Sequence, residues 1–231
     1  MAKKATRLEK ILKRLEQLYG TQTPIGPTDA YEMVLYRNAG YPQSDDRSTK
    51  GFEALKKEIG LQPEEILGVP HKRLAEVMRA GGMIPELRAS RLKEIAQIVK
   101  TEFDGDLHTV LKRPAAEARK ALKKFPTISD AGAEKILLFT KTAAVVALPS
   151  NCIHVPLRLG FGVERKNWAA SYREAQEAVR AELPEKGDAY RRAYLLLKRH
   201  GEELCKSARP RCEECPVSAE CRYYLGMRKD G

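Results

Sequence analysis

The stretch LCKSARPRCEECPVSAECRYY, residues 204–224, carries four of the five cysteines in the chain. Their spacing is C-x6-C-x2-C-x5-C, and the cysteines are Cys205, Cys212, Cys215 and Cys221. Four thiolates this close in sequence can surround one metal centre, and their negative charge needs a strongly positive partner. Iron–sulfur clusters and structural zinc both meet that need.

The loop lengths between the cysteines help to distinguish these two kinds of centre. Structural zinc sites usually combine two tight C-x2-C-like pairs, whereas only one pair here is that tight. The wide x6 and x5 loops suit a larger object, so the spacing favours a [4Fe–4S] cluster, with zinc as the alternative. A disulfide framework is disfavoured because a fifth cysteine is left over and the cysteine usage is cytosolic in type.

A family resemblance begins in the same region. The run HGEELCKSARPRCEECPVSAEC, from His200 to Cys221, resembles the C-terminal cluster motif of the endonuclease III family in cysteine spacing, in a preceding His-Gly and in a basic first loop. This family, also called the helix-hairpin-helix glycosylase superfamily, removes damaged bases from DNA. The resemblance extends more weakly over almost the whole chain, and it implies a [4Fe–4S] cluster held by the four cysteines.

The net charge favours a polyanionic partner. Lys and Arg number 42 against 31 Asp and Glu, which gives a formal net charge of +11 over 231 residues. Such an excess favours nucleic acid first and an anionic membrane surface second. No apolar run reaches the roughly 20 residues that span a bilayer, and the basic N-terminus has no apolar signal core. We therefore expect a cytoplasmic, nucleoid-associated protein that binds no membrane. The family resemblance implies that its partner is double-stranded DNA that is damaged or distorted, and a monomer is expected.

Apolar residues recur at helical spacing along the chain, and no segment alternates with period two over a useful length. The predicted fold is therefore all-α. A first helix is expected over residues 5–19, ended by Gly20. Further helices are expected near 29–39, 52–59, 74–78, 92–104, 118–122 and 129–140.

The C-terminal part should contain two longer helices. A capping box of Ser171 and Glu174 predicts the start of the first, and the second should run from Asp188 to Gly201. Residues 143–148 should form a buried helical turn, and Trp168 should lie in the core. Two helical lobes are expected: residues 22–142 form a helical domain that ends in a helix-hairpin-helix motif, and residues 1–21 join 143–231 to form the domain with the C-terminal iron–sulfur cluster loop.

The segment LKKFPTISDAGAEKILLF, residues 122–139, resembles the helix-hairpin-helix motif of the family. The matching positions carry Pro126, Ile128 and Ala133. Thr127 and Ser129 replace two glycines that let backbone N–H groups approach a phosphate, next to the positive end of the following helix. The resemblance implies DNA contacts from Thr127, Ile128 and Ser129, and an ordinary turn between helices is the alternative.

The two catalytic side chains of the family have no counterpart in this sequence. Ala131 stands where bifunctional members have a lysine that forms a Schiff base with C1′. Pro149 stands where the family has an aspartate that stabilises the oxocarbenium-like transition state. Substitutes are expected nearby if the protein is an enzyme, and the weak candidates are Lys135, Asn151 and His154. Solvated or structural roles for all three are the alternative.

Two further sets of residues are candidates for DNA contact. Lys206, Arg209 and Arg211 lie in the loop between the first two cysteines, and fixing this loop at both ends lowers the entropy lost when the charges meet phosphates. Tyr41, Gln43, Met83, Ile84 and Leu87 lie in two segments that correspond to loops of the family that enter the duplex beside an extruded base. Packing of these loops onto the body is the alternative.

Three classes of function follow. The first is a DNA glycosylase/AP lyase-like repair enzyme with displaced catalytic groups. The second is a non-catalytic protein that recognises lesions or distorted DNA. The third is an electron carrier, which would need the cluster but neither the hairpin nor the basic loop.

Overall fold

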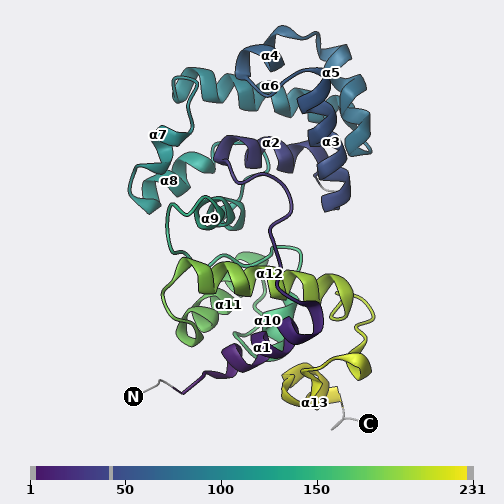
Figure 1. Cartoon of the computed structure of the whole chain (residues 1–231), viewed down its shortest axis with the longest axis vertical. Coiled ribbons are helices and arrows are strands. Elements are labelled where there is room, and N and C mark those ends of the chain that lie inside the picture. The colour runs from purple at the N-terminus through teal and green to yellow at the C-terminus, as the bar shows by residue number, and fades with distance from the viewer. Residues whose placement is uncertain (1–3, 42–43, 228–231) are drawn as a thin grey trace. The chain divides into compact units, whose positions relative to one another are not determined.

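The computed structural model describes residues 4–41 and 44–227. Within those residues the secondary structure consists of α-helices and short 3-10 helices, without a β-strand, which confirms the all-α prediction. The chain divides into two compact units (Figure 1), one made of Met1–Pro24 with Ala144–Gly231 and the other of Ile25–Ala143. The assignment of residues 22–142 and of residues 1–21 with 143–231 to two domains stays a prediction. No helix in the described part of the chain is both long and apolar enough to cross a membrane.

The unit of the two chain ends is built around the first helix. Thr6 caps α1 in a reciprocal capping box with Glu9, and Gly20 ends the helix with a φ of 70°. Helix α1 packs against α11 and α12, and α10 contacts α11, α12 and α13. The helices of this unit are α1 (Arg7–Tyr19), α10 (His154–Leu159), α11 (Trp168–Glu182), α12 (Gly187–Glu203) and α13 (Arg222–Met227), with the 3-10 helices η2 (Cys212–Glu214) and η3 (Ser218–Glu220).

The middle of the chain forms the second unit. Its long helix α6 packs against α2, α4 and α5, and α9 packs against α2 and α8. The apolar face of α6 is fully buried and includes Leu92, Ile95 and Val99. The elements are α2 (Ala30–Gly40), α3 (Asp45–Glu58), α4 (Pro63–Gly68), α5 (His71–Met78), η1 (Arg79–Gly81), α6 (Pro85–Glu102), α7 (His108–Leu111), α8 (Ala115–Leu122) and α9 (Asp130–Phe139).

Two expectations about helix ends are wrong. Helix α11 starts three residues before Ser171, because the Asn167 side chain caps it by accepting from the Ala170 N–H at 2.8 Å. Ser171 lies inside the helix, and its hydroxyl accepts from the Arg165 N–H. Gly201 does not end α12, which continues to Glu203.

Two expectations about burial and local structure are also wrong. Trp168 is 44% exposed because it stands at the first position of α11, where it stacks on Tyr172 with ring centroids 5.0 Å apart. Residues 143–148 form neither a helical turn nor a strand. Val146, Ala147 and Leu148 are buried nonetheless, and the Leu148 N–H donates to the Tyr172 hydroxyl at 3.1 Å. A side chain therefore provides the hydrogen bond that a helix would have made internally.

Candidate metal centre and nucleic-acid interface

The four C-terminal cysteines line one cavity, together with Arg158, His200, Tyr223 and Tyr224. The backbone reaches this arrangement through tight turns that follow helix α12. The Cys205 N–H donates to the His200 carbonyl at 2.8 Å, so the first cysteine is tied to the last turns of the helix. Helix η2 leads from Cys212 to Cys215, whose N–H donates back to the Cys212 carbonyl at 3.2 Å. Residues far apart in sequence are thus brought to one thiol-lined space.

Arg158 lies beside two of the four sulfur atoms. Its Nη1 is 3.6 Å from the Cys205 Sγ, and its carbonyl oxygen is 3.3 Å from the Cys221 Sγ. The guanidinium also donates to the carbonyls of Lys206 and Ser207, both at 2.8 Å, and stacks on the Tyr223 ring at 4.7 Å. Arg158 therefore supplies positive charge to the cavity and fixes the first part of the cysteine loop.

The ionisation of the thiols is unfavourable in this environment. Burial raises the pKa of the Cys205 and Cys212 thiols and raises the pKa of Cys215 to about 11. Thiols of this kind stay protonated near neutrality unless a positive centre stabilises the thiolates. Within the described residues, no group of three or more His, Cys, Asp or Glu side chains is arranged to hold a single metal ion. The donor set of four thiols around one cavity, with cationic and N–H donors beside the sulfurs, fits a thiolate-bound cluster.

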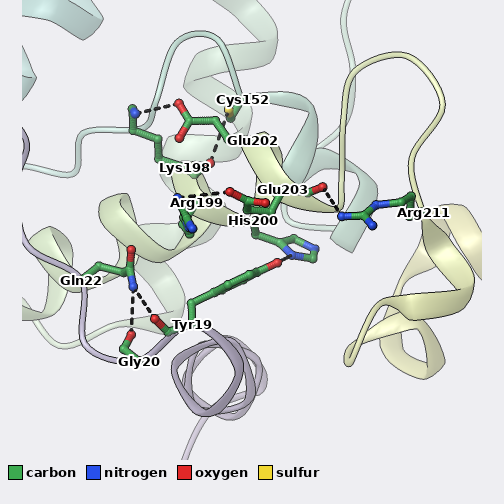
Figure 2. Close-up of polar contacts among 10 residues, drawn as sticks. All are labelled: Tyr19, Gly20, Gln22, Cys152, Lys198, Arg199, His200, Glu202, Glu203 and Arg211. Carbon is green, nitrogen blue, oxygen red and sulfur yellow. Dashed lines mark hydrogen bonds and ion pairs between the residues drawn. The ribbon is translucent and has the colours of Figure 1, made fainter. Parts of the chain in front are cut away.

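Two histidines contact the cysteine segment. The His154 Nε2 is 2.7 Å from the Cys205 carbonyl oxygen, and the His200 Nε2 is 3.6 Å from the Cys215 Sγ. The other ring nitrogen of His200 lies 3.0 Å from the Tyr19 hydroxyl (Figure 2). Burial lowers the pKa of both histidines, that of His200 to about 4. Both imidazoles are therefore neutral and hydrogen-bonded in place.

The predicted basic loop is exposed, but its three cations differ. Lys206, Arg209 and Arg211 all lie on the surface. Arg211 is already engaged, because it donates to the Glu203 carbonyl and pairs with Glu214, both at 3.0 Å. Arg209 has a φ of +56°, so the chain turns sharply at this residue between the first two cysteines.

The hairpin keeps a glycine-like backbone without the glycine. Thr127 has a φ of +64°, the left-handed conformation that a β-branched residue rarely adopts. Contacts to α2 hold it there: the Thr127 carbonyl accepts from the Arg37 Nε, and Thr127 donates its hydroxyl to the buried Asn38, both at 3.2 Å. Ile128 is buried, whereas Ser129 is exposed and makes no capping hydrogen bond to α9. Ser129 and the following residue, Asp130, are therefore the exposed residues where the hairpin meets α9.

The two positions at which the family carries catalytic side chains hold buried apolar residues in this protein. Ala131 is buried in the first turn of α9, and Pro149 is buried in the segment before α10. Among the candidate substitutes, Lys135 is half-buried one turn after Ala131, and Asn151 is exposed in a turn. His154 is held against the Cys205 carbonyl. That contact gives His154 a structural function in the cysteine segment.

The two loops that were predicted to enter the duplex present apolar side chains to solvent. Met83 is 68% exposed, Ile84 56% and Tyr41 39%, and Leu87 is exposed at the start of α6. Gln43 lies outside the described residues. The loop of Met83 and Ile84 is sharply bent, because Gly82 has a φ of +101° and Ile84 a φ of +62°.

Sequence reasoning missed Arg88, which supports both of these loops. Its side chain is 1% exposed and donates to the carbonyls of Gly82, Met83 and Gly40, while its Nε has no partner among the described residues. Gly81 allows the backbones to approach, since a Cβ there would lie 1.9 Å from the Ala39 carbonyl oxygen. The signal in the sequence was a basic residue four positions before Leu92, on the apolar face of α6.

Comparison with known proteins defines the class to which this fold belongs. The solved structure of a trapped endonuclease III–DNA covalent intermediate matches 96% of this chain and 97% of its own, with a TM-score of 0.75 and 17% identity. The molecule therefore has the endonuclease III fold.

Sequence comparison finds relatives of the same kind. Endonuclease III of Sulfolobus acidocaldarius is 23% identical over 203 residues, which cover 87% of this chain and 86% of the relative. A thymine/uracil-DNA glycosylase of Methanothermobacter thermautotrophicus is 28% identical over 163 residues, or 70% of this chain and 67% of the relative. No family model matches the chain. In sequence and fold, the chain is similar to endonuclease III and to related DNA glycosylases.

Proposed function

We propose that this protein acts in DNA base-excision repair by binding double-stranded DNA at damaged or distorted sites. The observation that carries the proposal is the hairpin, in which Thr127 keeps the left-handed backbone and Ser129 leaves the start of α9 without a side-chain cap. Uncapped N–H groups at a helix N-terminus bind phosphate oxygens well, because they donate hydrogen bonds and lie at the positive end of the helix dipole. The similarity to endonuclease III–DNA complexes supports the same reading.

The cysteine cavity supports a second part of the proposal. We infer that Cys205, Cys212, Cys215 and Cys221 hold a [4Fe–4S] cluster. When bound, the cluster supplies the positive charge that keeps the four thiols ionised. Arg158 then neutralises part of the excess negative charge and fixes the loop that presents Lys206 and Arg209. These two cations are the members of the basic loop that we expect to meet DNA phosphates.

The chemistry of the protein must differ from that of the lyases in the family. Ala131 provides no amine and Pro149 no carboxylate, so neither a Schiff base nor electrostatic stabilisation of an oxocarbenium ion can arise at these positions. Lys135 is the first candidate for a displaced nucleophile, since it lies one helical turn along α9. The second candidate function is recognition of lesions without base excision, and the two buried apolar residues favour it.

A trapping experiment tests the chemistry. The purified holoprotein is incubated with duplexes that carry oxidised pyrimidines or an abasic site, and borohydride is added to reduce any Schiff base to a stable adduct. We expect little or no covalent complex, while binding to the abasic duplex persists in the same samples. Efficient trapping that disappears in Lys135→Ala would identify a displaced lyase. Efficient trapping that persists in that variant would refute two claims: that Ala131 occupies the position of the catalytic lysine, and that Lys135 replaces that lysine.

Base release decides between the two candidate functions. The same duplexes, with a panel of different damaged bases, are incubated without borohydride and then treated with hot alkali to cleave any abasic product. Strand cleavage at one lesion would establish a glycosylase without lyase chemistry. Tight binding without cleavage on any lesion would establish the recognition function.

A further inference from the structure

A pair of hydrogen-bonded side chains from two helices reaches the cysteine cavity: Tyr19 ends α1, and His200 lies in the last turns of α12. The Tyr19 hydroxyl is 3.0 Å from the His200 Nδ1, and the His200 Nε2 is 3.6 Å from the Cys215 Sγ. Figure 2 shows the Tyr19 ring beneath the imidazole, with the hydroxyl directed at it. The three groups therefore form one continuous line from α1 to a cysteine.

The direction of these hydrogen bonds follows from the chemistry of a bound thiolate. A neutral imidazole has one N–H group and one lone pair. A thiolate offers only lone pairs, so an Nε2 lone pair facing Cys215 would be repelled, whereas an Nε2–H would be attracted. The proton then sits on Nε2, and Nδ1 accepts from the Tyr19 hydroxyl. Ligation of Cys215 and the position of Tyr19 select the same tautomer.

Both ends of the line are held in place. His200 is 1% exposed, and its carbonyl oxygen accepts from the Leu204 N–H at 3.0 Å and the Cys205 N–H at 2.8 Å. The Tyr19 carbonyl oxygen accepts from the Gln22 side-chain amide at 2.6 Å, which fixes the end of α1 (Figure 2). These contacts hold the Tyr19–His200 pair in place beside Cys215.

Resting on the cluster proposed above, we propose that Tyr19 and His200 form a hydrogen-bond relay that donates to the Cys215 ligand and sets the reduction potential of the cluster. Hydrogen bonds to cluster sulfurs stabilise the more negative, reduced state and so raise the potential. Tyr19 and His200 are positioning residues, since neither touches a substrate. Cys205 receives its own donor from Arg158, so the relay acts on Cys215 separately.

Four variants test the relay. Tyr19→Phe removes the hydroxyl and leaves the imidazole, and His200→Leu removes the donor. His200→Gln places an amide N–H near the position of Nε2 and should restore donation to the sulfur. Tyr224→Phe is the control, because Tyr224 lines the same cavity but its hydroxyl donates to Glu213 at 2.9 Å. For each protein, iron and sulfide are counted and the reduction potential is measured by a redox titration followed by electron paramagnetic resonance.

We expect the potential to shift to more negative values in Tyr19→Phe and further in His200→Leu, and to stay near that of the parent in His200→Gln and Tyr224→Phe. A parent-like potential in Tyr19→Phe with full iron content would overturn the relay, even if His200→Leu failed to fold. Equal shifts in Tyr19→Phe and Tyr224→Phe would overturn it too, because the effect would then belong to the cavity as a whole. Absence of iron and sulfide from the unsubstituted protein would instead refute the proposal that the four cysteines hold a cluster.

Discussion

Substitution of Gly201 by alanine tests how tightly α12 is packed where the cysteine segment begins. A Cβ at Gly201 would lie 2.6 Å from the Cys152 Sγ and 3.0 Å from the Val155 Cγ2, so the helix or its neighbours must move. Overpacking of this kind costs about 1–3 kcal/mol. Alanine in a helix interior is more stabilising than glycine by roughly 0.5–1 kcal/mol, which offsets part of that cost. The net expectation for Gly201→Ala is a loss of stability from near zero to about 2.5 kcal/mol.

Gly68→Ala is the matched control, since Gly68 is also helical and has nothing within 4 Å of an added Cβ. It should gain up to about 1 kcal/mol, because only the helix-propensity contribution applies. Urea denaturation of both holoproteins measures the difference in the free energy of unfolding. Iron content should fall only in Gly201→Ala, because its helix also carries His200, which lines the cysteine cavity. A Gly201→Ala protein as stable as Gly68→Ala, with full iron, would refute the packing of Cys152 against α12.

Three further outcomes can be measured on the same preparations. Arg209→Ala should flatten the plot of log K for DNA against log salt by about 0.9, and Arg211→Ala should flatten it less because a carboxylate already pairs with it; equal slopes in both variants and the parent, by fluorescence anisotropy, would remove the loop from the interface. Arg88→Met should destabilise the protein by about 1–3 kcal/mol per carbonyl left unpaired, and it should weaken binding to an abasic duplex more than binding to intact DNA; a parent-like melting temperature would contradict the buried contacts. Cys212→Ser should lower iron content and thermal stability together, whereas Cys152→Ser should keep its iron, and equal losses in the two variants would contradict the four-cysteine site.

The sequence predicted the fold class well because the signals that decide it are local. Helical periodicity located α1, α2 and α9 to within a few residues, and Gly20 was placed correctly at the end of α1. The short helices α4 and α7 were missed, since six and four residues carry too little periodicity to register. The predicted start of α11 was wrong because two capping residues compete locally, and Asn167 stands four residues before Ser171.

The features of the candidate site that sequence reasoning missed depend on tertiary contacts. Gly201 was interpreted as a helix end, whereas it is required by the side chain of Cys152, which is remote in sequence. Thr127 replaces a glycine of the hairpin motif, yet contacts from Arg37 and Asn38 hold its left-handed backbone. No local pattern could have paired Tyr19 with His200, because the two residues meet only when α1 packs against α12.

The central claim is that the protein recognises damaged or distorted DNA, and one affinity ratio tests it directly. The dissociation constant of the holoprotein is measured at one fixed salt concentration for a duplex with a single abasic-site analogue and for the same duplex intact. Non-specific phosphate contacts are common to both duplexes, so they cancel in the ratio. We predict that the abasic duplex binds at least about tenfold more tightly, which corresponds to roughly 1.4 kcal/mol. Equal affinity for the two duplexes would contradict recognition of damaged or distorted DNA.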